Sequence, residues 1–315
     1  MNNTTQREVL AVSLNSAWQK TLNFPTVHCG GVNRAVECHG AGGGKGVNVA
    51  RVFRLLNEPV ALAAFAGGST GQLLCEELRQ SGVRQLVVES AGPTRCCYTV
   101  IDRERGEATE LIEPSAPISQ EETNALMTLL AQSMREFSAV ALCGSLPPGV
   151  PDDIYAQIAR LAHASGVPVV LDAVKSLDAV LREGVTLLKI NHSELRQLST
   201  GNSMLQCAAA LLARYPNLRW LAVTDGPEPA GFFSRNGSWS ITLPRLEHIV
   251  SPIGGGDCAT AIMTRFIATG NTCDADAARA FGHACACASA SCLTDTPSVF
   301  DEAVAMAMAP VVAPL

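Results

Sequence analysis

Three glycines directly precede Asp257 in the stretch 251–270, SPIGGGDCATAIMTRFIATG, and a helical pattern of apolar residues begins at once behind them. Backbone N–H groups and the positive end of a helix dipole favour an anion at such a start, whereas an aspartate disfavours one. Phosphoryl transfer uses both features, because amides stabilise charge growing on the transferred phosphoryl group while the aspartate orients and deprotonates the attacking hydroxyl. The predicted catalytic residues are Gly254, Gly255, Gly256 and Asp257, although an N-cap aspartate after a flexible turn would give the same pattern.

A second glycine-rich stretch, 39–53, has the sequence HGAGGGKGVNVARVF and surrounds Lys45 with glycines. It does not form the phosphate-binding pattern G-x-x-x-x-G-K-[ST], which would require a glycine at His39 and a hydroxyl at Gly46. The dinucleotide pattern G-x-G-x-x-G does not fit this stretch either. The loop therefore needs an explanation that only the rest of the chain can supply.

Strand-like and helix-like segments alternate along the chain and must position these two loops. Apolar runs predict strands, and amphipathic patterns, several of them opened by Ser, Thr or Asp caps, predict helices. This succession predicts an α/β fold with a doubly wound, mainly parallel sheet and ligands at the carboxyl ends of its strands. The predicted strands are 9–14, 60–66, 139–146, 167–173, 185–191 and 219–226, and the predicted helices are 47–56, 72–80, 121–134, 152–164, 193–198 and 205–215.

Two segments interrupt the alternation. The stretch 94–114, TRCCYTVIDRERGEATELIEP, alternates at strand period around a polar turn and predicts a hairpin outside the main sheet. Together with 24–38 it is predicted to form a small β-sheet lid. The stretch 230–244 carries an Asn236-Gly237 turn and predicts a second hairpin at the edge of the main sheet.

Composition excludes several classes of protein. The 315 residues carry a net charge of −6 and only four lysines, which argues against general binding to nucleic acid or to anionic membranes. The start of the chain lacks a basic region followed by a long apolar stretch, so a cytoplasmic enzyme is expected. The 12 cysteines include no C-x-x-C pair and the six histidines do not cluster, so most cysteines are expected to be small buried residues rather than zinc ligands.

Taken in order, the motifs resemble those of the PfkB-type, ribokinase-like carbohydrate kinases, and within them the branch of 1-phosphofructokinases and tagatose-6-phosphate kinases. The resemblance implies one Rossmann-type domain over 1–315, with a lid formed by about 24–38 and 94–114. The lid of this family often mediates dimers, so a homodimer through the lid is one expected assembly. The matching segments are NR at 33–34, GGKGVNVAR at 43–51, TR at 94–95, GSLPPGV at 144–150, LD at 171–172, KIN-x-x-E at 189–194 and GGGD at 254–257.

The resemblance also implies a sugar side of the site. In this family the GGKG-x-N loop faces the sugar, where glycines allow close backbone approach and polar side chains donate to hydroxyls or to a phosphate. The arginine that opens the lid hairpin matches the family's position for a substrate phosphate, whereas taken alone it would be a solvated lid arginine. The implied substrate-binding residues are Asn15, Gln19, Gly43, Gly44, Lys45, Asn48, Arg95 and Ser145.

On the nucleotide side, KINHSE places oxygen ligands between a strand end and a helix start, where they suit Mg²⁺, usually through water, and its lysine can reach ATP phosphates. Without the resemblance this stretch would be only a capped helix start. The segment VTDG resembles the strand end that lines the nucleotide. The implied cofactors are ATP and Mg²⁺, with Lys189, Asn191, Glu194, Thr224 and Gly226 near the nucleotide and Asn191 and Glu194 near the metal.

Some positions depart from the family pattern. Gln19 stands where the family has an aspartate that grips sugar hydroxyls, unless the register has shifted and another acid such as Glu37 replaces it. Cys97, Thr99 and Ile112 stand on the lid at positions where polar residues are expected from the branch. Ile190 replaces a proline, which should not disturb the neighbouring polar groups. The catalytic residues are therefore predicted to be intact while recognition of the sugar has changed.

Three functions follow from these observations. The first is an ATP-dependent kinase of a phosphorylated ketohexose, such as fructose 1-phosphate or tagatose 6-phosphate, or of a close relative. The second is a kinase of an unphosphorylated sugar or polyol. The third is a non-catalytic regulator that binds a sugar or a nucleotide, which the retention of Asp257, Asn191 and Glu194 disfavours.

Overall fold

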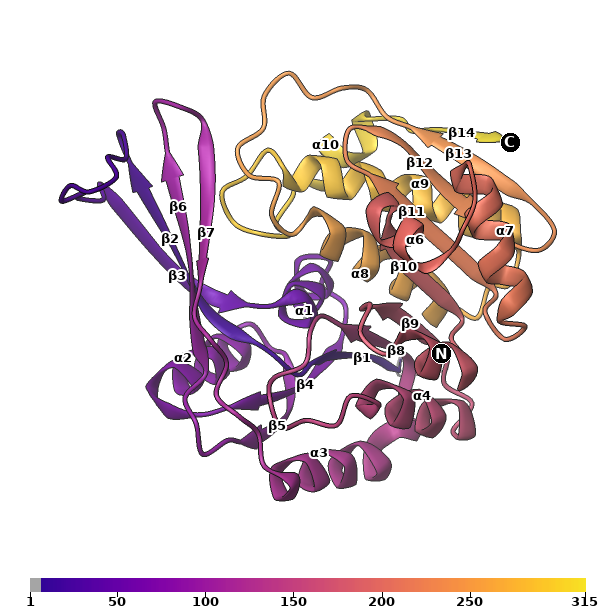
Figure 1. The fold of residues 1–315 in the computed structure, drawn as a ribbon, viewed down its shortest axis with the longest axis horizontal. Coiled ribbons are helices and arrows are strands. Elements are labelled where there is room, and N and C mark those ends of the chain that lie inside the picture. The colour runs from indigo at the N-terminus through magenta and orange to yellow at the C-terminus, as the bar shows by residue number, and fades with distance from the viewer. Residues whose placement is uncertain (1–6) are drawn as a thin grey trace, which may run out of the picture.

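A computed structural model describes residues 7–315, and within them the main sheet has ten strands in the order β14-β13-β12-β11-β10-β9-β8-β1-β4-β5 (Figure 1). Seven neighbouring strands are parallel, from β5 to β11, and the last three are antiparallel. The parallel strands are β1 (Glu8–Ser13), β4 (Val60–Ala66), β5 (Arg84–Glu89), β8 (Phe137–Cys143), β9 (Val169–Asp172), β10 (Leu187–Asn191) and β11 (Trp220–Asp225). The antiparallel strands are β12 (Glu228–Phe233), β13 (Ser238–Thr242) and β14 (Val311–Pro314).

Helices cover both faces of this sheet, which explains why a strand such as β4, VALAAFA, is buried at every position. One apolar core joins the sheet to α3 (Gln120–Ser133), α4 (Ile154–Ala164), α5 (Leu177–Arg182), α6 (His192–Leu198) and α7 (Met204–Arg214), with a short 3-10 helix (Met134–Glu136) after α3. The core on the other face joins it to α1 (Lys45–Leu55), α2 (Gly68–Gln80), α8 (Gly255–Ala268), α9 (Asp274–Ser291) and α10 (Glu302–Ala307). The doubly wound α/β fold is thus confirmed.

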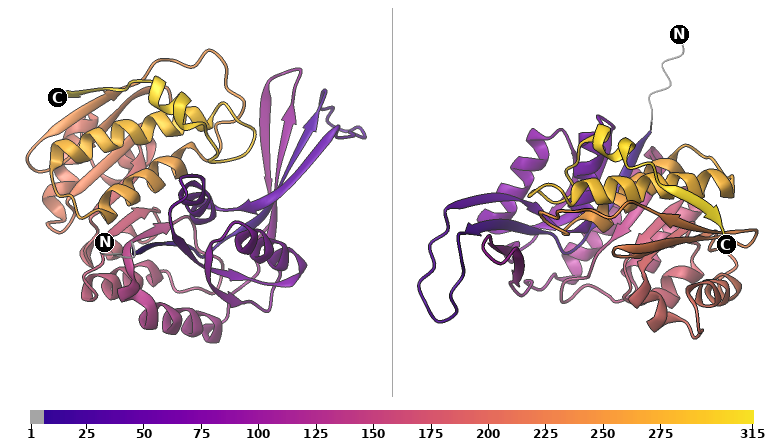
Figure 2. Two further views of the ribbon diagram at one scale, coloured as in Figure 1. Left: turned by 180° about the vertical axis from the view of Figure 1, so that it is seen from behind. Right: turned by 90° about the horizontal axis from the view of Figure 1, so that it is seen from above.

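A second sheet, called the small sheet below, has four strands in the order β3-β2-β6-β7 within the described residues and projects from the main body (Figure 1, Figure 2). Its strands are β2 (Ala17–Phe24), β3 (Glu37–Gly43), β6 (Arg95–Asp102) and β7 (Glu107–Ile112). Residues 25–36, most of the segment expected to contribute strands, instead connect β2 to β3. Neither flanking sequence, AWQKTLNF or ECHGAGG, has a regular strand pattern, and their pairing with each other creates the strands.

The hairpin expected at 230–244 is confirmed as β12 and β13, with its turn at 234–237. Strands β5 and β14 of the main sheet were not predicted from the sequence. Strand β5, RQLVVE, carries charges at both ends, and β14 has only four residues, so neither sequence signals a buried strand. Their place in the sheet comes from pairing with β4 and β13.

The direction of winding changes at β1. From β1 the chain adds β4 and β5 on one side, and it later adds β8, β9, β10 and β11 in turn on the other side. Ligands of open α/β sheets bind at the carboxyl ends of the strands next to such a change of direction. The ends of β1 and β8, at Ser13 and Cys143, mark that place here.

Candidate active site

Asp172, the last residue of β9, is the centre of a buried polar cluster and is itself 2% exposed. Its Oδ1 accepts a hydrogen bond from Lys45 Nζ at 2.6 Å, and its Oδ2 accepts from Lys189 Nζ at 3.1 Å and from Thr260 Oγ1 at 2.6 Å. Burial alone would raise the pKa of Asp172, but the two lysine charges outweigh burial and lower the pKa to about 2. Asp172 therefore stays ionised and holds both ammonium groups in place.

Asp172 and Thr260 were not among the predicted site residues. The aspartate ends the apolar run VPVVLD, and a charged residue at the carboxyl end of a buried strand is a signal that could have identified it. Nothing in the sequence around Thr260 distinguishes it, because its role depends on the packing of α8 against β9.

Asp257 lies in the first turn of α8, one residue beyond the glycines that open the helix. Its Oδ2 accepts a hydrogen bond from Asn48 Nδ2 of α1 at 2.7 Å. Burial and the negative charge of Asp172 raise the pKa of Asp257 to about 6, against the opposing effects of the Asn48 hydrogen bond and of the two lysines. A carboxylate with such a pKa can accept a proton near neutral pH.

The start of α8 offers backbone donors beside this carboxylate. Gly254 has a φ of 85°, a left-handed conformation that favours glycine, and it caps the helix without a side-chain hydrogen bond. The first N–H groups of a helix have no partner within the helix, so those of Gly255 and Gly256 are available to an anion. A Cβ on Gly256 would lie 2.8 Å from Lys189 Nζ, so the lysine approaches this backbone only because the residue is glycine.

Lys45 is the first residue of α1 and follows Gly44, whose φ of 110° again requires glycine. Burial lowers the pKa of this lysine, but Asp172 more than compensates and raises the pKa above its usual value. The ammonium group is therefore a permanent positive charge. Gly43 ends β3 immediately before this turn, so the small sheet leads directly into the site.

Arg95, at the start of β6, lies in a second polar cluster with Asn15, Ser115 and Ser145. Its Nη2 donates to the Asn15 carbonyl oxygen at 3.1 Å, while Asn15 Nδ2 donates to Ser145 Oγ at 3.0 Å and Ser115 Oγ donates to Asn15 Oδ1 at 2.7 Å. Arg95 Nε is buried and has no hydrogen-bond partner among residues 7–315. The cluster thus combines a positive charge with an unused buried donor, which is the chemistry of an anion site.

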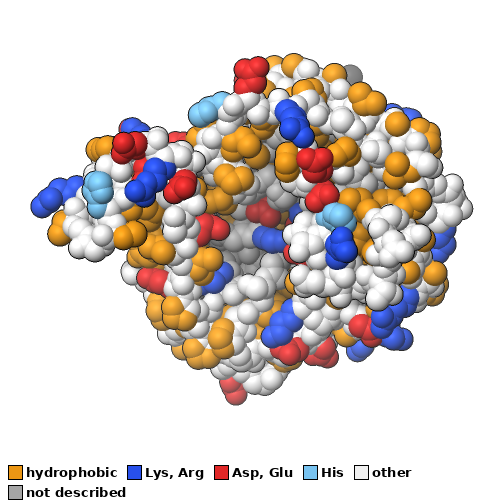
Figure 3. Space-filling model, turned by 45° about the horizontal axis from the view of Figure 1, so that its top comes forward, with side chains coloured by type: hydrophobic (Ala, Val, Ile, Leu, Met, Phe, Trp, Pro, Cys, Tyr) orange, Lys and Arg blue, Asp and Glu red, His pale blue; other side chains and the backbone are white. Residues whose placement is uncertain are grey.

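A cavity of about 360 Å³ joins the two clusters at the carboxyl ends of β1, β8 and β9. Figure 3 shows a hollow between the small sheet and the main body, with basic and acidic side chains at its floor. Among the residues that line the cavity are Asn15, Lys45, Arg95, Ser145, Asp172 and Glu194. The structure therefore brings predicted residues from distant parts of the sequence to one cavity.

The predicted nucleotide side lies on β10, β11 and α6. Asn191 and Glu194 form a capping box, in which Asn191 Oδ1 accepts from the Glu194 N–H and Glu194 Oε2 accepts from the Asn191 N–H, each at 2.8 Å. Thr224 pairs with Asn191 across the two strands, and Gly226 has a φ of 56° in the turn after β11. Lys189 Nζ contacts Asp172 within the cluster described above.

Of the two residues predicted to lie near the metal, Asn191 and Glu194, only the glutamate lines the cavity. Magnesium in kinases usually keeps several waters and binds one or two carboxylates together with substrate phosphates. The donor set therefore fits a hydrated magnesium ion held partly by a nucleotide. Within residues 7–315 no group of three or more His, Cys, Asp or Glu side chains is arranged to hold a metal by itself.

Gln19 lies on β2, and its Nε2 donates to Thr99 Oγ1 on β6 at 3.0 Å. It does not line the 360 Å³ cavity but a smaller hollow next to the loop around Thr296. Because Gln19 pairs with Cys97, two residues after Arg95, the glutamine and the arginine project from the same face of the small sheet.

The expectation that most cysteines are buried holds for half of them. Six of the 12 cysteines are buried, three are half-buried and three are exposed, and all are free thiols. No helix within the described part of the chain has both the length and the apolar character that a membrane crossing requires.

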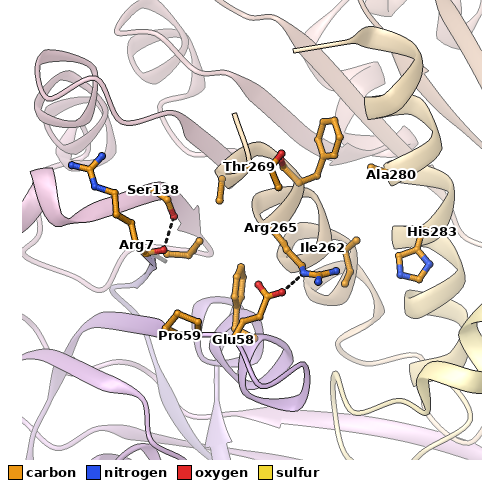
Figure 4. A pocket seen from close by; sticks show the side chains of 13 residues that line it. Arg7, Glu58, Pro59, Ser138, Ile262, Arg265, Thr269, Ala280 and His283 are labelled. Atoms are coloured by element: carbon orange, nitrogen blue, oxygen red, sulfur yellow. Dashed lines mark hydrogen bonds and ion pairs between the residues drawn. The ribbon is translucent and has the colours of Figure 1, made fainter. Parts of the chain in front are cut away.

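A larger cavity of about 540 Å³ lies at the opposite, amino-terminal ends of β1 and β8 (Figure 4). Its walls include the carboxyl-terminal parts of α1 and α8, and an ion pair between Glu58 and Arg265 connects the two sides. None of the predicted site residues lines this cavity, so size alone does not identify the active site.

Comparison with known proteins adds to this geometry. Residues 13–300 match the model of the pfkB family carbohydrate kinases. A solved structure described as a phosphofructokinase from Staphylococcus aureus is 26% identical, with a TM-score of 0.80 over 98% of this chain and 99% of that one. Phosphofructokinase-2 from Escherichia coli in complex with fructose-6-phosphate is 22% identical, with a TM-score of 0.83 over 96% of this chain and 98% of that one. A protein described as a 1-phosphofructokinase from Thermotoga maritima is 23% identical, with a TM-score of 0.84 over 98% and 99% of the two chains.

Proposed function

Because the chain belongs to the PfkB family of carbohydrate kinases, we propose that it transfers the γ-phosphoryl group of ATP to a hydroxyl of a sugar that already carries a phosphate. The family and the fold, a large mainly parallel sheet with a smaller second sheet, agree with the expectations from the motif order, and both are confirmed. The substrate class and the residue roles below are our proposals.

One observation carries the proposal of a phosphorylated substrate: Arg95 lines the cavity, and its buried Nε has no hydrogen-bond partner among residues 7–315. A buried donor without a partner costs free energy, and an anionic ligand that accepts its hydrogen bond removes that cost. A guanidinium suits a phosphate because its planar donors match two phosphate oxygens. Asn15 and Ser145, which are already hydrogen-bonded to each other, would bind neighbouring hydroxyls of the sugar.

The proposed base is Asp257. Its ionised carboxylate would accept the proton of the attacking hydroxyl, and the raised pKa makes it a better acceptor than an ordinary aspartate. The N–H groups of Gly255 and Gly256 would stabilise the charge on the transferred phosphoryl group, and Lys45 and Lys189 would add positive charge from the same side.

ATP would bind toward β10 and β11, where Thr224 and Gly226 lie on either side of the last residue of β11 and Glu194 lines the cavity. Magnesium bound with ATP neutralises phosphate charge and orients the transferred group. Glu194 and Asn191 would hold the metal through water, because the capping box already occupies the single side-chain oxygen of Asn191 and one of the two oxygens of Glu194.

A homodimer through the small sheet is the proposed assembly. Four large apolar side chains of this region are exposed: Val32, Val36, Leu111 and Ile112. Exposed apolar side chains on a projecting element favour association. Light scattering of the chain and of an Ile112→Asp variant would support the proposal with a dimer that the substitution dissociates, and a monomeric wild-type chain would contradict it.

The proposed activity is tested by a screen for ADP release over ketohexose phosphates, unphosphorylated sugars and polyols, and nucleosides. Turnover of phosphosugars in preference to their free counterparts supports the proposal. Preference for a free sugar or polyol would replace it with the second function, which the missing carboxylate at Gln19 leaves open. Binding of sugar or nucleotide without any ADP release would indicate a regulator.

A further inference from the structure

Arg51 connects three elements around the proposed base without being part of the cavity. Its Nη1 donates to Asn48 Oδ1 at 2.6 Å and to the Pro297 carbonyl oxygen at 3.4 Å, and its Nη2 donates to the Gly42 carbonyl oxygen at 2.6 Å and pairs with Glu77 Oε1 at 3.1 Å. Glu77, on α2, also accepts a hydrogen bond from the Gly42 N–H. One guanidinium thus joins α1 to α2 and to β3, the strand of the small sheet that leads into the site.

The contact with Asn48 determines which way its amide points. A side-chain amide has an accepting oxygen at one end and a donating nitrogen at the other. Arg51 has only donors, so it holds the oxygen end of Asn48 and directs the nitrogen end toward Asp257, 2.7 Å away. Asn48 is 4% exposed, so no bulk water competes for either end.

We propose that Arg51 is a positioning residue for Asp257: by fixing the oxygen of the Asn48 amide, it ensures that the amide donates to the carboxylate and never accepts from it. The inference rests on the proposed role of Asp257 as the base. A donor at that carboxylate favours the ionised form, whereas an amide turned by 180° would present its oxygen and favour the protonated form.

A guanidinium is suited to this position because its contacts lie in different directions. It reaches Asn48, Gly42 and Glu77 at once through a rigid, planar set of donors. The carboxylate of Glu77 balances its charge, so the arginine can remain mostly buried near the site. A lysine has a single nitrogen and cannot hold the same three acceptors in one geometry.

Several other charged or titratable groups act on Asp257 and must be constant in any test. They come from α1, β8, β9, β10 and α8 itself, and they are Lys45, Cys143, Asp172, Lys189 and Cys258. None of them contacts Arg51 through a hydrogen bond or ion pair in the described residues. Replacing Arg51 therefore removes the donor to the Asn48 amide and no hydrogen bond or ion pair of these groups.

The test is the titration midpoint of the Asp257 carboxyl carbon, followed by NMR in protein labelled with ¹³C-aspartate and assigned with Asp257→Asn. Arg51→Met is expected to raise the midpoint by roughly one unit, since hydrogen bonds to charged groups contribute about that much. Arg54→Met is the matched control, because Arg54 lies on the same helix but donates to the carbonyl oxygens of Ser81 and Glu58. An unchanged midpoint in folded Arg51→Met would overturn the proposal.

Kinetics provide a second readout on the best phosphosugar. The acid limb of kcat/KM is expected to move to higher pH by the same amount in Arg51→Met, with kcat reduced about fivefold at pH 6 and about tenfold well below it, and the KM for ATP little changed. If no sugar is turned over, the proposed function fails but the NMR titration still decides the role of Arg51. Should Arg51→Met not fold, Arg51→Ala takes its place, because it also removes the donor to Asn48 Oδ1, and a wild-type midpoint in that variant would equally overturn the proposal.

Discussion

Asp172 and Asp257 are two buried carboxyl groups of one site whose pKa values are shifted in opposite directions. The pKa of Asp172 is lowered to about 2, because Lys45 and Lys189 overcome the effect of burial, and that of Asp257 is raised to about 6, because burial and the charge of Asp172 outweigh its own partners. Environments that separate two pKa values in this way assign different roles to chemically identical groups. Asp172 is suited to hold charge and Asp257 is suited to move a proton.

Replacing the proposed base should abolish turnover and leave ATP binding largely intact. Asp257→Asn keeps the shape of the side chain and the contact with Asn48 but removes the group that accepts the proton. General base catalysis contributes roughly 10²–10⁴-fold, so kcat should fall at least that far. Calorimetric ATP titration alongside steady-state kinetics checks both parts, with Asp153→Asn, at the exposed start of α4, as the control. Near-wild-type kcat would rule out the assignment.

Activity should decline at acid pH with a midpoint near 6. The pKa of Asp257 is raised, so the carboxylate is ionised above that pH and becomes protonated and inactive as the pH falls through it. Above pH 7 the rate should be nearly constant, and below pH 6 it should fall about tenfold per unit. A profile of kcat/KM checks this, with the substrate phosphate followed separately by ³¹P NMR because it titrates in the same range. A midpoint near 4 would contradict the raised pKa.

Removing the guanidinium of Arg95 should weaken a phosphorylated sugar far more than its unphosphorylated counterpart. Only the former loses a charge-assisted hydrogen bond, so the difference between the two effects should be on the order of ten- to a hundredfold in Kd. The comparison uses Arg95→Ala for both sugars. The control is Arg103→Ala, because Arg103 directly follows β6 and pairs with Glu37, so it is an arginine of the small sheet with another partner. Equal losses for both sugars would favour an unphosphorylated substrate.

Glu194→Gln should raise the magnesium concentration needed for half-maximal rate more than it raises the KM for the sugar. Glutamine can retain the capping hydrogen bond to the Asn191 N–H, so α6 should keep its start while the carboxylate charge is lost. Glu122→Gln is a close control, because Glu122 forms the same capping box with Ser119 at the start of α3. Rates that do not depend on added magnesium in either protein would argue against a metal-assisted reaction.

The sequence predicted the main architecture because its signals are local. Continuous apolar runs such as VALAAFA and VPVVLDA mark strands covered on both faces, and the motif order indicated the family. The small sheet was harder to predict, because ECHGAGG becomes a strand only when it pairs with β2. Likewise, Thr260 enters the site through the packing of α8 on β9. Arg51 lies next to the site because it bonds to Gly42 of β3 and Glu77 of α2, two contacts that its own helix does not encode.

The position of β1 in the main sheet has a consequence for how the chain acquires its structure on the ribosome. This early strand pairs with β4 on one side and with β8 on the other, and Ser13 finds its partner Cys143 only after nearly half of the chain has been synthesised. Pairing between such distant segments is slow, because a long loop must close before any contact forms. Until residues 137–143 have been synthesised, β1 therefore lacks its partner on one side, and the unpaired backbone N–H and C=O groups along that edge can pair with another chain.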